Sequence, residues 1–345
     1  MRIEQFDFGT TKDGVLVKGY RLKNADHLSI SVINWGATLI SVKTPDRNGI
    51  VEEITLGFDT FKDYEDHSPY FGSTVGRVAN RIKGGCFDLD GVQYQMEKNE
   101  NGINHLHGGK KGISKVVWEI ETENATDSAS IRCKYFSKDG EEGYPGDLSI
   151  EMTFTLTESN DLIFDYQATT TKTCPLNLTN HAYWNLSGGK KRSVLNHELQ
   201  LNCDAFLPVD DHLIPTGEIK PVAGTPWDFR KARSIGKEIE QAGGYDHCYV
   251  FRRDRGDCEQ IATVLEPISG REMIVYTTEP GVQFYSGNFL HRKEKQGFKI
   301  HDGLCLETQF FPNAVNQESF PSILLKPGEF YSQKTIHRFS TKLAD

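Results

Sequence analysis

A strict alternation of apolar and polar side chains is the feature that most constrains the fold of this chain. Apolar residues occupy every second position over residues 148–156, and the pattern resumes over 162–166 after the turn residues Ser159 and Asn160. Alternation with a period of two places the apolar side chains on one face of a strand. The two runs therefore predict an antiparallel hairpin with one buried face.

Shorter runs of the same kind recur along the whole chain. They cover residues 28–32, 35–42, 54–58, 86–90, 92–96, 261–265, 273–277, 282–285 and 323–325. Asp90-Gly91 is a turn signal between two of them. Helical patterns are confined to one or two turns at 61–67 and to 231–242, where Ala232, Ile235 and Ile239 are three and four apart. The pattern predicts an all-β fold, a large antiparallel sandwich or barrel with very little helix. Without a linker or repeat, residues 1–345 are expected to form one domain.

Charge and composition exclude several classes of protein. The 345 residues carry 39 Lys and Arg against 48 Asp and Glu, a net charge of −9, which argues against nucleic acid and anionic membranes as main partners. No run approaches the ~20 apolar residues that span a bilayer, and the N-terminus lacks the apolar core of a secretory signal. Seven widely spaced cysteines without a CxxC pair predict free thiols in a reducing compartment, hence a cytoplasmic location.

Residues 175–189, PLNLTNHAYWNLSGG, form the most informative segment. It begins with strand-like alternation and ends at a glycine turn, and His181 stands among aromatic rings and Asn side chains. Aromatic faces and amides suit a sugar ligand. An aromatic core strand with a buried, hydrogen-bonded histidine explains the segment equally well, so the segment alone leaves both interpretations open.

Other candidate residues lie in glycine-containing segments elsewhere. His105 and His107 have the spacing of metal ligands on a strand, but Gly108-Gly109-Lys-Lys follows where a carboxylate ligand is needed, so we expect no metal. Glu307 is a lone carboxylate in a mostly apolar strand, where burial is costly unless the group is paired or functional. The sequence contains no dinucleotide-binding GxGxxG after a strand, no P-loop, no HExxH and no GxSxG.

Taken together, the motifs resemble the aldose 1-epimerase (galactose mutarotase) family. The matching segments run in the family's order and cover nearly the whole chain: GRVANRI (76–82), LHGG (106–109), EEGYPG (141–146), PLNLTNHAYWNL (175–186), LPVD with LIPTGE (207–218), GYDHCY (244–249), PGVQFYSGN (280–288) and CLETQ (305–309). The resemblance implies the family's large β-sandwich and conversion between the α and β anomers of free hexoses such as galactose and glucose, without cofactor or metal.

The resemblance also implies residue roles. Glu307 is expected to be the general base and His181 the general acid, and the residues expected to bind the sugar are Asn80, Arg81, His107, Tyr183, Asp246 and Gln283. His105 receives no role, and the resemblance leaves open whether Arg77 and Trp184 touch the sugar.

Three other functions stay open at this level. A non-catalytic sugar-binding module would not need Glu307 and His181 together. A glycoside hydrolase would need two carboxylates flanking one bond, and Asp246 is a weak candidate for the second. A hexose-6-phosphate 1-epimerase would need extra basic groups, which a net charge of −9 does not favour. The expected partner is a small aldohexose, and a monomer is favoured over an oligomer.

Overall fold

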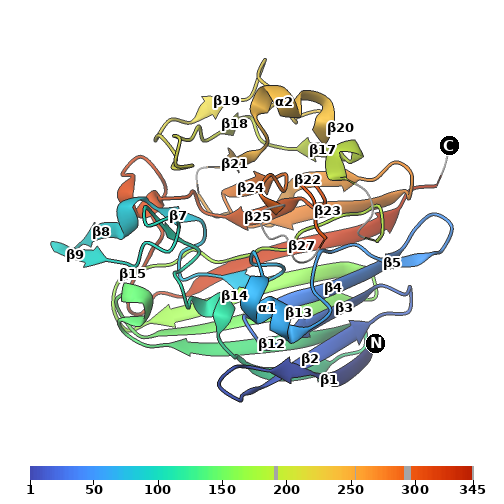
Figure 1. The fold of residues 1–345 in the computed structure, drawn as a ribbon, viewed down its shortest axis with the longest axis horizontal. Coiled ribbons are helices and arrows are strands. Elements are labelled where there is room, and N and C mark those ends of the chain that lie inside the picture. Colours follow the sequence, from blue (N-terminus) through green and yellow to red (C-terminus); the bar gives the residue numbers. More distant parts are fainter. Residues whose placement is uncertain (190–192, 253, 291–296, 344–345) are drawn as a thin grey trace.

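The largest element of the fold is a nine-stranded antiparallel sheet. The computed structural model describes residues 1–189, 193–252, 254–290 and 297–343. The sheet has the strand order β11-β12-β13-β14-β27-β23-β22-β17-β20 and crosses the whole molecule (Figure 1). Its strands are β11 (Glu119–Asn124), β12 (Ser128–Ser137), β13 (Leu148–Thr157), β14 (Asp161–Thr170), β27 (Tyr331–Thr341), β23 (Arg271–Thr277), β22 (Glu259–Leu265), β17 (Glu198–Leu201) and β20 (Arg233–Ser234).

Two five-stranded sheets cover one face of this large sheet. The first comprises β1 (Arg2–Thr10), β2 (Leu16–Lys23), β3 (Ser29–Ile33), β4 (Thr38–Pro45) and β5 (Val51–Glu53). The second, with the order β19-β18-β21-β24-β25, comprises β19 (Lys220–Pro221), β18 (Ala205–Phe206), β21 (Asp246–Val250), β24 (Gly281–Tyr285) and β25 (Cys305–Gln309).

Four short two-stranded ladders lie outside these three sheets. They are β6 (Thr74–Val75) with β16 (Thr179–Asn180), β7 (Arg81–Ile82) with β10 (His105–Leu106), β8 (Cys86–Leu89) with β9 (Val92–Gln95), and β15 (Cys174–Pro175) with β26 (Leu324–Leu325). Helix is limited in the described residues to α1 (Phe61–His67), α2 (Ile239–Ala242) and single 3₁₀ turns. Thr60 caps α1, because its side chain accepts a hydrogen bond from the Asp63 amide.

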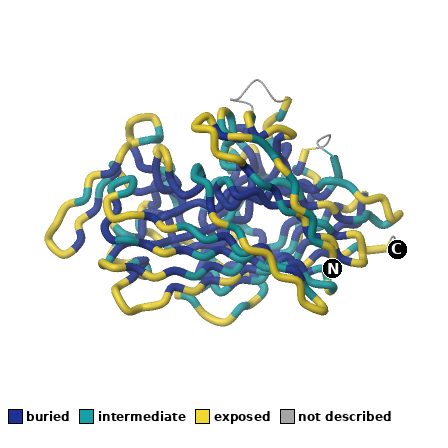
Figure 2. The backbone as a smooth tube through the Cα atoms, turned by 90° about the horizontal axis from the view of Figure 1, so that it is seen from below, coloured by how far each residue is buried: buried dark blue, intermediate teal, exposed yellow. Residues whose placement is uncertain are grey.

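The hydrophobic core lies between the layers. One cluster of buried side chains joins Ile30 of β3, Phe154 of β13, Val275 of β23 and Phe284 of β24, so all three large sheets share it. The buried backbone accordingly runs through the middle of the molecule, and exposed residues gather at the turns (Figure 2). This arrangement is the large antiparallel β-sandwich that the sequence predicts.

The strongest sequence prediction is confirmed in detail. β13 and β14 pair as a hairpin, and residues 148, 150, 152, 154 and 156 are all buried. The 86–89/92–95 hairpin also forms, and Asp90 and Gly91 both have positive φ. Two predictions need correction. Residues 54–58 form no strand and make only a single bridge, at Thr55. The helix expected over 231–242 is replaced by the two-residue strand β20, a 3₁₀ turn and the four α-helical residues of α2.

The second correction has a local cause. Gly243 adopts a left-handed conformation and ends α2, while Arg233 and Ser234 pair with β17 at the edge of the large sheet. Among the described residues, no helix is long and apolar enough to cross a membrane. That residues 1–345 form one domain stays a prediction.

Candidate active site

The two faces of the β21-β24-β25 sheet have different environments. Leu306 belongs to the main core between the sheets, and Thr308 hydrogen-bonds through its hydroxyl to Thr335 of the large sheet at 2.6 Å. Because successive side chains point to opposite faces, Cys305 and Glu307 point away from that core. All residues of β25 are buried. The Glu307 carboxylate can nevertheless occupy this strand, because the face that carries Glu307 borders a cavity.

The cavity has a volume of about 310 Å³, within the range of small-molecule sites. Its polar lining consists of His67, Asn80, Arg81, Glu100, His107, His181, Asp246 and Glu307. Its aromatic lining consists of Phe58, Tyr70, Phe71, Tyr183, Tyr285, Phe289 and Phe298. The combination of flat apolar rings and convergent polar groups suits a sugar, whose ring has apolar C–H faces and a polar rim.

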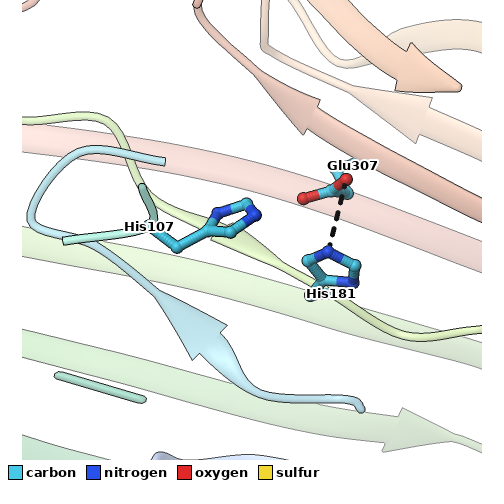
Figure 3. Close-up of side chains that lie close together, drawn as sticks. All are labelled: His107, His181 and Glu307. Carbon is cyan, nitrogen blue, oxygen red and sulfur yellow. Dashed lines mark ion pairs between the residues drawn. The ribbon is translucent and has the colours of Figure 1, made fainter. Parts of the chain in front are cut away.

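Glu307 and His181 meet in this cavity. Glu307 Oε1 lies 3.8 Å from His181 Nε2, and the side chains are 3% and 7% exposed. Figure 3 shows the Glu307 carboxylate above the edge of the His181 ring. Burial raises the pKa of Glu307 well above its usual value of 4.5, with the Asp246 charge adding to the rise, and burial lowers the pKa of His181 to about 4. Each group is thus driven toward its neutral form.

His107 is held by reciprocal hydrogen bonds with Asn80. The backbone N–H of His107 donates to the backbone carbonyl of Asn80 at 2.9 Å, and the backbone N–H of Asn80 donates to His107 Nδ1 at 3.2 Å. Both residues have positive φ, a conformation that costs free energy and is common at functional sites. At Gly108 a Cβ atom would lie 1.7 Å from the Gly76 carbonyl oxygen, so the LHGG segment needs glycine there.

The protonation of His107 decides how it can act. Burial lowers its pKa well below 6.5, so the ring is neutral. Since Nδ1 accepts a hydrogen bond, the single proton resides on Nε2, which becomes a donor. One nitrogen or oxygen atom of each of His107, His181 and Glu307 lies within 4.8 Å of the others. Nevertheless, His107 has no free lone pair for a metal ion while the Asn80 bond is intact, so this donor set does not fit a metal.

Arg81 and Asp246 are each held by a further residue. Arg81 donates from Nε and Nη2 to the Glu100 carboxylate at 2.8–3.0 Å. Gln283 donates from Nε2 to Asp246 Oδ1 at 2.7 Å, and it lies outside the residues that line the cavity. Gln283 therefore supports Asp246 from behind the cavity wall.

The remaining candidates differ in position. The Tyr183 ring stacks on His181 with centroids 5.0 Å apart and lines the cavity. Trp184 is buried against His337 and Phe339 in the main core, away from the cavity. His105 contacts the Glu97 carbonyl through Nδ1 at 2.8 Å. The segment 175–189 thus combines both sequence interpretations, because His181 and Tyr183 face the cavity while Trp184 faces the core.

Arg77 lies away from the cavity. Its buried guanidinium donates to the carbonyl oxygens of Ser137, Lys138, Pro145 and Gly146 and to the Ser137 hydroxyl. It ties the 76–82 segment to the EEGYPG loop.

Sequence reasoning missed several cavity residues. Glu100 stands in a polar loop and carries no signal in the sequence, because its importance arises only from its contact with Arg81. Tyr70 and Phe71 form an aromatic pair shortly before the 76–82 segment, and both line the cavity. Phe58, Tyr285, Phe289 and Phe298 resemble ordinary core residues in the sequence.

Comparison with known proteins agrees with the fold. Residues 18–338 match the family model described as aldose 1-epimerase. Galactose mutarotase from Sus scrofa is 45% identical over 340 residues, covering 96% of this chain and 97% of that protein, and aldose 1-epimerase from Escherichia coli K12 is 36% identical over 339 residues, covering 95% and 96%.

Solved structures give the same result. The aldose epimerase homologue from C. elegans has a TM-score of 0.85 at 35% identity, covering 93% of this chain and 98% of that one. Galactose 1-epimerase from Lactobacillus acidophilus has a TM-score of 0.86 at 27% identity, covering 99% of both chains. This chain therefore belongs to the aldose 1-epimerase family.

Proposed function

We propose that this protein is an aldose 1-epimerase that interconverts the α and β anomers of free hexoses such as galactose and glucose. In this proposal Glu307 is the general base and His181 the general acid. The observation that carries it is the buried contact of these two groups, 3.8 Å apart, in a cavity of sugar-binding character. The enzyme is an isomerase and its substrate is a small sugar.

The geometry suits the proton transfers of ring opening. Mutarotation breaks the bond between C1 and the ring oxygen O5, lets C1 rotate about C1–C2, and closes the ring again. Opening removes a proton from the C1 hydroxyl and delivers one to O5. Because both oxygens are bonded to C1, an adjacent base and acid can reach them at the same time. Each positioned acid or base typically contributes ~10²–10⁴-fold in rate.

The electrostatics of the pair favours the open-chain intermediate. Ring opening uses the carboxylate form of Glu307 and the imidazolium form of His181, and it leaves both groups neutral. Burial raises the pKa of Glu307 and lowers that of His181, so it stabilises the neutral pair relative to the ion pair. The buried cavity therefore makes proton transfer toward the opened sugar less unfavourable than it would be in water.

The remaining cavity residues orient the sugar. Arg81 and the Nε2–H of His107 donate to sugar oxygens, Asn80 holds His107 and lines the cavity, and Asp246, supported by Gln283, accepts from hydroxyl groups. Tyr183 offers a ring face beside His181. We assign these positions as binding residues because they converge on the space in front of Glu307.

A phosphorylated hexose is a poorer substrate for this cavity. Among the described lining residues, Arg81 is the one Lys or Arg side chain, and Glu100 already engages it, while Asp246 and Glu307 add two carboxyl groups. A phosphate group would meet carboxylates instead of free cations. We further propose a cytoplasmic, cofactor-free monomer with one domain over residues 1–345; the seven free thiols support the reducing location.

Polarimetry tests the proposal directly. The protein is expected to accelerate the change in optical rotation of freshly dissolved α-D-galactose, and Glu307→Gln is expected to lower kcat at least a hundredfold while galactose still binds. Glu123→Gln is the matched control, because it makes the same change at an exposed glutamate on β11, and it should retain full activity. A Glu307→Gln variant with more than about a tenth of the wild-type rate would remove Glu307 as the base. A wild-type protein that binds galactose without accelerating mutarotation would be a sugar-binding module.

A further inference from the structure

β25 contacts both ring nitrogens of His181. Cys305 and Glu307 are two residues apart on this strand and point to the same face. Glu307 Oε1 lies 3.8 Å from His181 Nε2, and Cys305 Sγ lies 3.6 Å from His181 Nδ1, within the range of a sulfur hydrogen bond. The strand that supplies the proposed base thus also supplies a partner for the opposite edge of the proposed acid.

We infer that Cys305 is a positioning residue, whose sulfur accepts the Nδ1–H of His181 and thereby keeps Nε2 free to exchange a proton with the sugar. This inference rests on the proposed role of His181 as the acid. Cys305 itself does not line the cavity, and it acts through His181.

The proton balance of the proposed reaction requires such a partner. The imidazolium carries protons on both nitrogens, and after Nε2 delivers its proton to O5 the ring keeps the proton on Nδ1. The Nδ1–H bond therefore persists through ring opening and closure, and it needs an acceptor in a site where His181 is almost fully buried. Burial raises the pKa of the Cys305 thiol well above its usual value, so the acceptor is a neutral sulfur.

A neutral sulfur has a particular chemical consequence. Thiols are weak hydrogen-bond acceptors, whereas a carboxylate at the same place would stabilise the imidazolium and weaken it as an acid. Cys305 therefore orients the ring and selects its tautomer without reducing the acidity of His181. Tyr183 and Tyr70 stack on the His181 ring, with centroids 5.0 and 5.9 Å away. Because stacking does not distinguish the two ring nitrogens, the sulfur determines which edge of the ring faces Glu307.

Nitrogen NMR of ¹⁵N-histidine-labelled protein at neutral pH tests the inference, with His181 assigned by comparison with His181→Asn. The expected result is protonated Nδ1 and bare Nε2 in wild type, and a mixture of tautomers in Cys305→Ala. In the same variant kcat is expected to fall about tenfold, as for other residues that orient a functional histidine, with KM within twofold of wild type. Cys305→Ser keeps an acceptor and is expected to retain the wild-type tautomer.

Cys133→Ala is the matched control. Cys133 is a fully buried thiol of β12 in the main core, so its removal reproduces the loss of a buried sulfur without contact to His181. The inference is overturned if wild-type His181 carries its proton on Nε2 with bare Nδ1, or if Cys305→Ala leaves the tautomer unchanged. If Cys305→Ala does not fold, the wild-type spectrum alone decides. Absence of mutarotase activity in wild type would instead refute the proposed function.

Discussion

The β13–β14 hairpin and the segments around the cavity are built in opposite ways. The hairpin pairs residue by residue over its whole length, with every second side chain in the core. The cavity segments make ladders of only two residues, at β6, β7, β10 and β16, and Tyr70, Asn80 and His107 have positive φ. Long regular strands provide a rigid support, and short irregular segments can aim polar side chains at one point.

This contrast predicts a division of effects between the two regions. Substitutions at the cavity should change turnover or affinity with little loss of stability, and substitutions in the regular sheet should change stability with little effect on the activity of folded molecules.

The largest effect is expected for His181→Asn. Loss of the general acid should lower kcat by ~10²–10⁴-fold, because O5 then leaves without a proton donor. Polarimetry gives the turnover and calorimetric titration with galactose gives the affinity. A variant that loses binding but turns over bound sugar at the wild-type rate would place the acid elsewhere.

Phe154→Ala should cost a similar amount of free energy, but in the stability of the fold instead of in turnover. Phe154 is fully buried, and its ring packs edge-on against Phe164 across the hairpin at 5.6 Å. Its truncation should lower the free energy of unfolding by ~3–5 kcal/mol, through lost apolar contact and a residual cavity. Urea unfolding measures this loss. A fall in kcat per folded molecule comparable to that of His181→Asn would contradict the division.

The pH dependence of stability should reveal buried histidines in the framework. His197 accepts a hydrogen bond from the Leu186 amide at 2.9 Å, and burial lowers its pKa to about 4 from 6.5. Between these pH values the unfolded chain binds a proton that the folded chain does not, so stability falls as pH falls. At pH 4.5 this group should cost about 2–3 kcal/mol relative to pH 7.

His197→Gln tests this assignment, because Gln can keep the acceptor and does not titrate. Urea unfolding at pH 7 and pH 4.5 should show a smaller loss of stability in the variant than in wild type. The raised pKa values of Asp246 and Glu307 act in the opposite sense in both proteins and cancel in the difference. Equal losses in the two proteins would show that His197 is not the group concerned.

The smallest effect is expected for Glu100→Gln. Glu100 holds Arg81 through charge-assisted hydrogen bonds, and the amide would keep an acceptor without the charge. Looser positioning of the guanidinium should raise KM about fivefold, close to 1 kcal/mol, with kcat unchanged. Lys62, exposed on α1, supplies the matched control as Lys62→Gln. An unchanged KM would mean that Arg81 is positioned without Glu100.

Two neighbouring arginines show where sequence reasoning reaches its limit. Arg77 and Arg81 are four residues apart in one motif, and both are buried. Arg77 binds backbone carbonyls of a distant loop, whereas Arg81 lines the cavity beside Glu100. Nothing local distinguishes them, because their partners lie 19 to 69 residues away along the chain.

Local pattern follows from the amino-acid order alone: alternation with a period of two, turn residues between the strands and the composition of each motif, which together define an all-β sandwich and a set of candidate residues. Tertiary structure alone decided which of them share one space. His181 and Glu307 are brought to 3.8 Å by the packing of distant strands, and Gln283 falls behind Asp246 for the same reason. Local propensities act over a few residues, whereas proximity across a cavity depends on the register and packing of the whole sandwich.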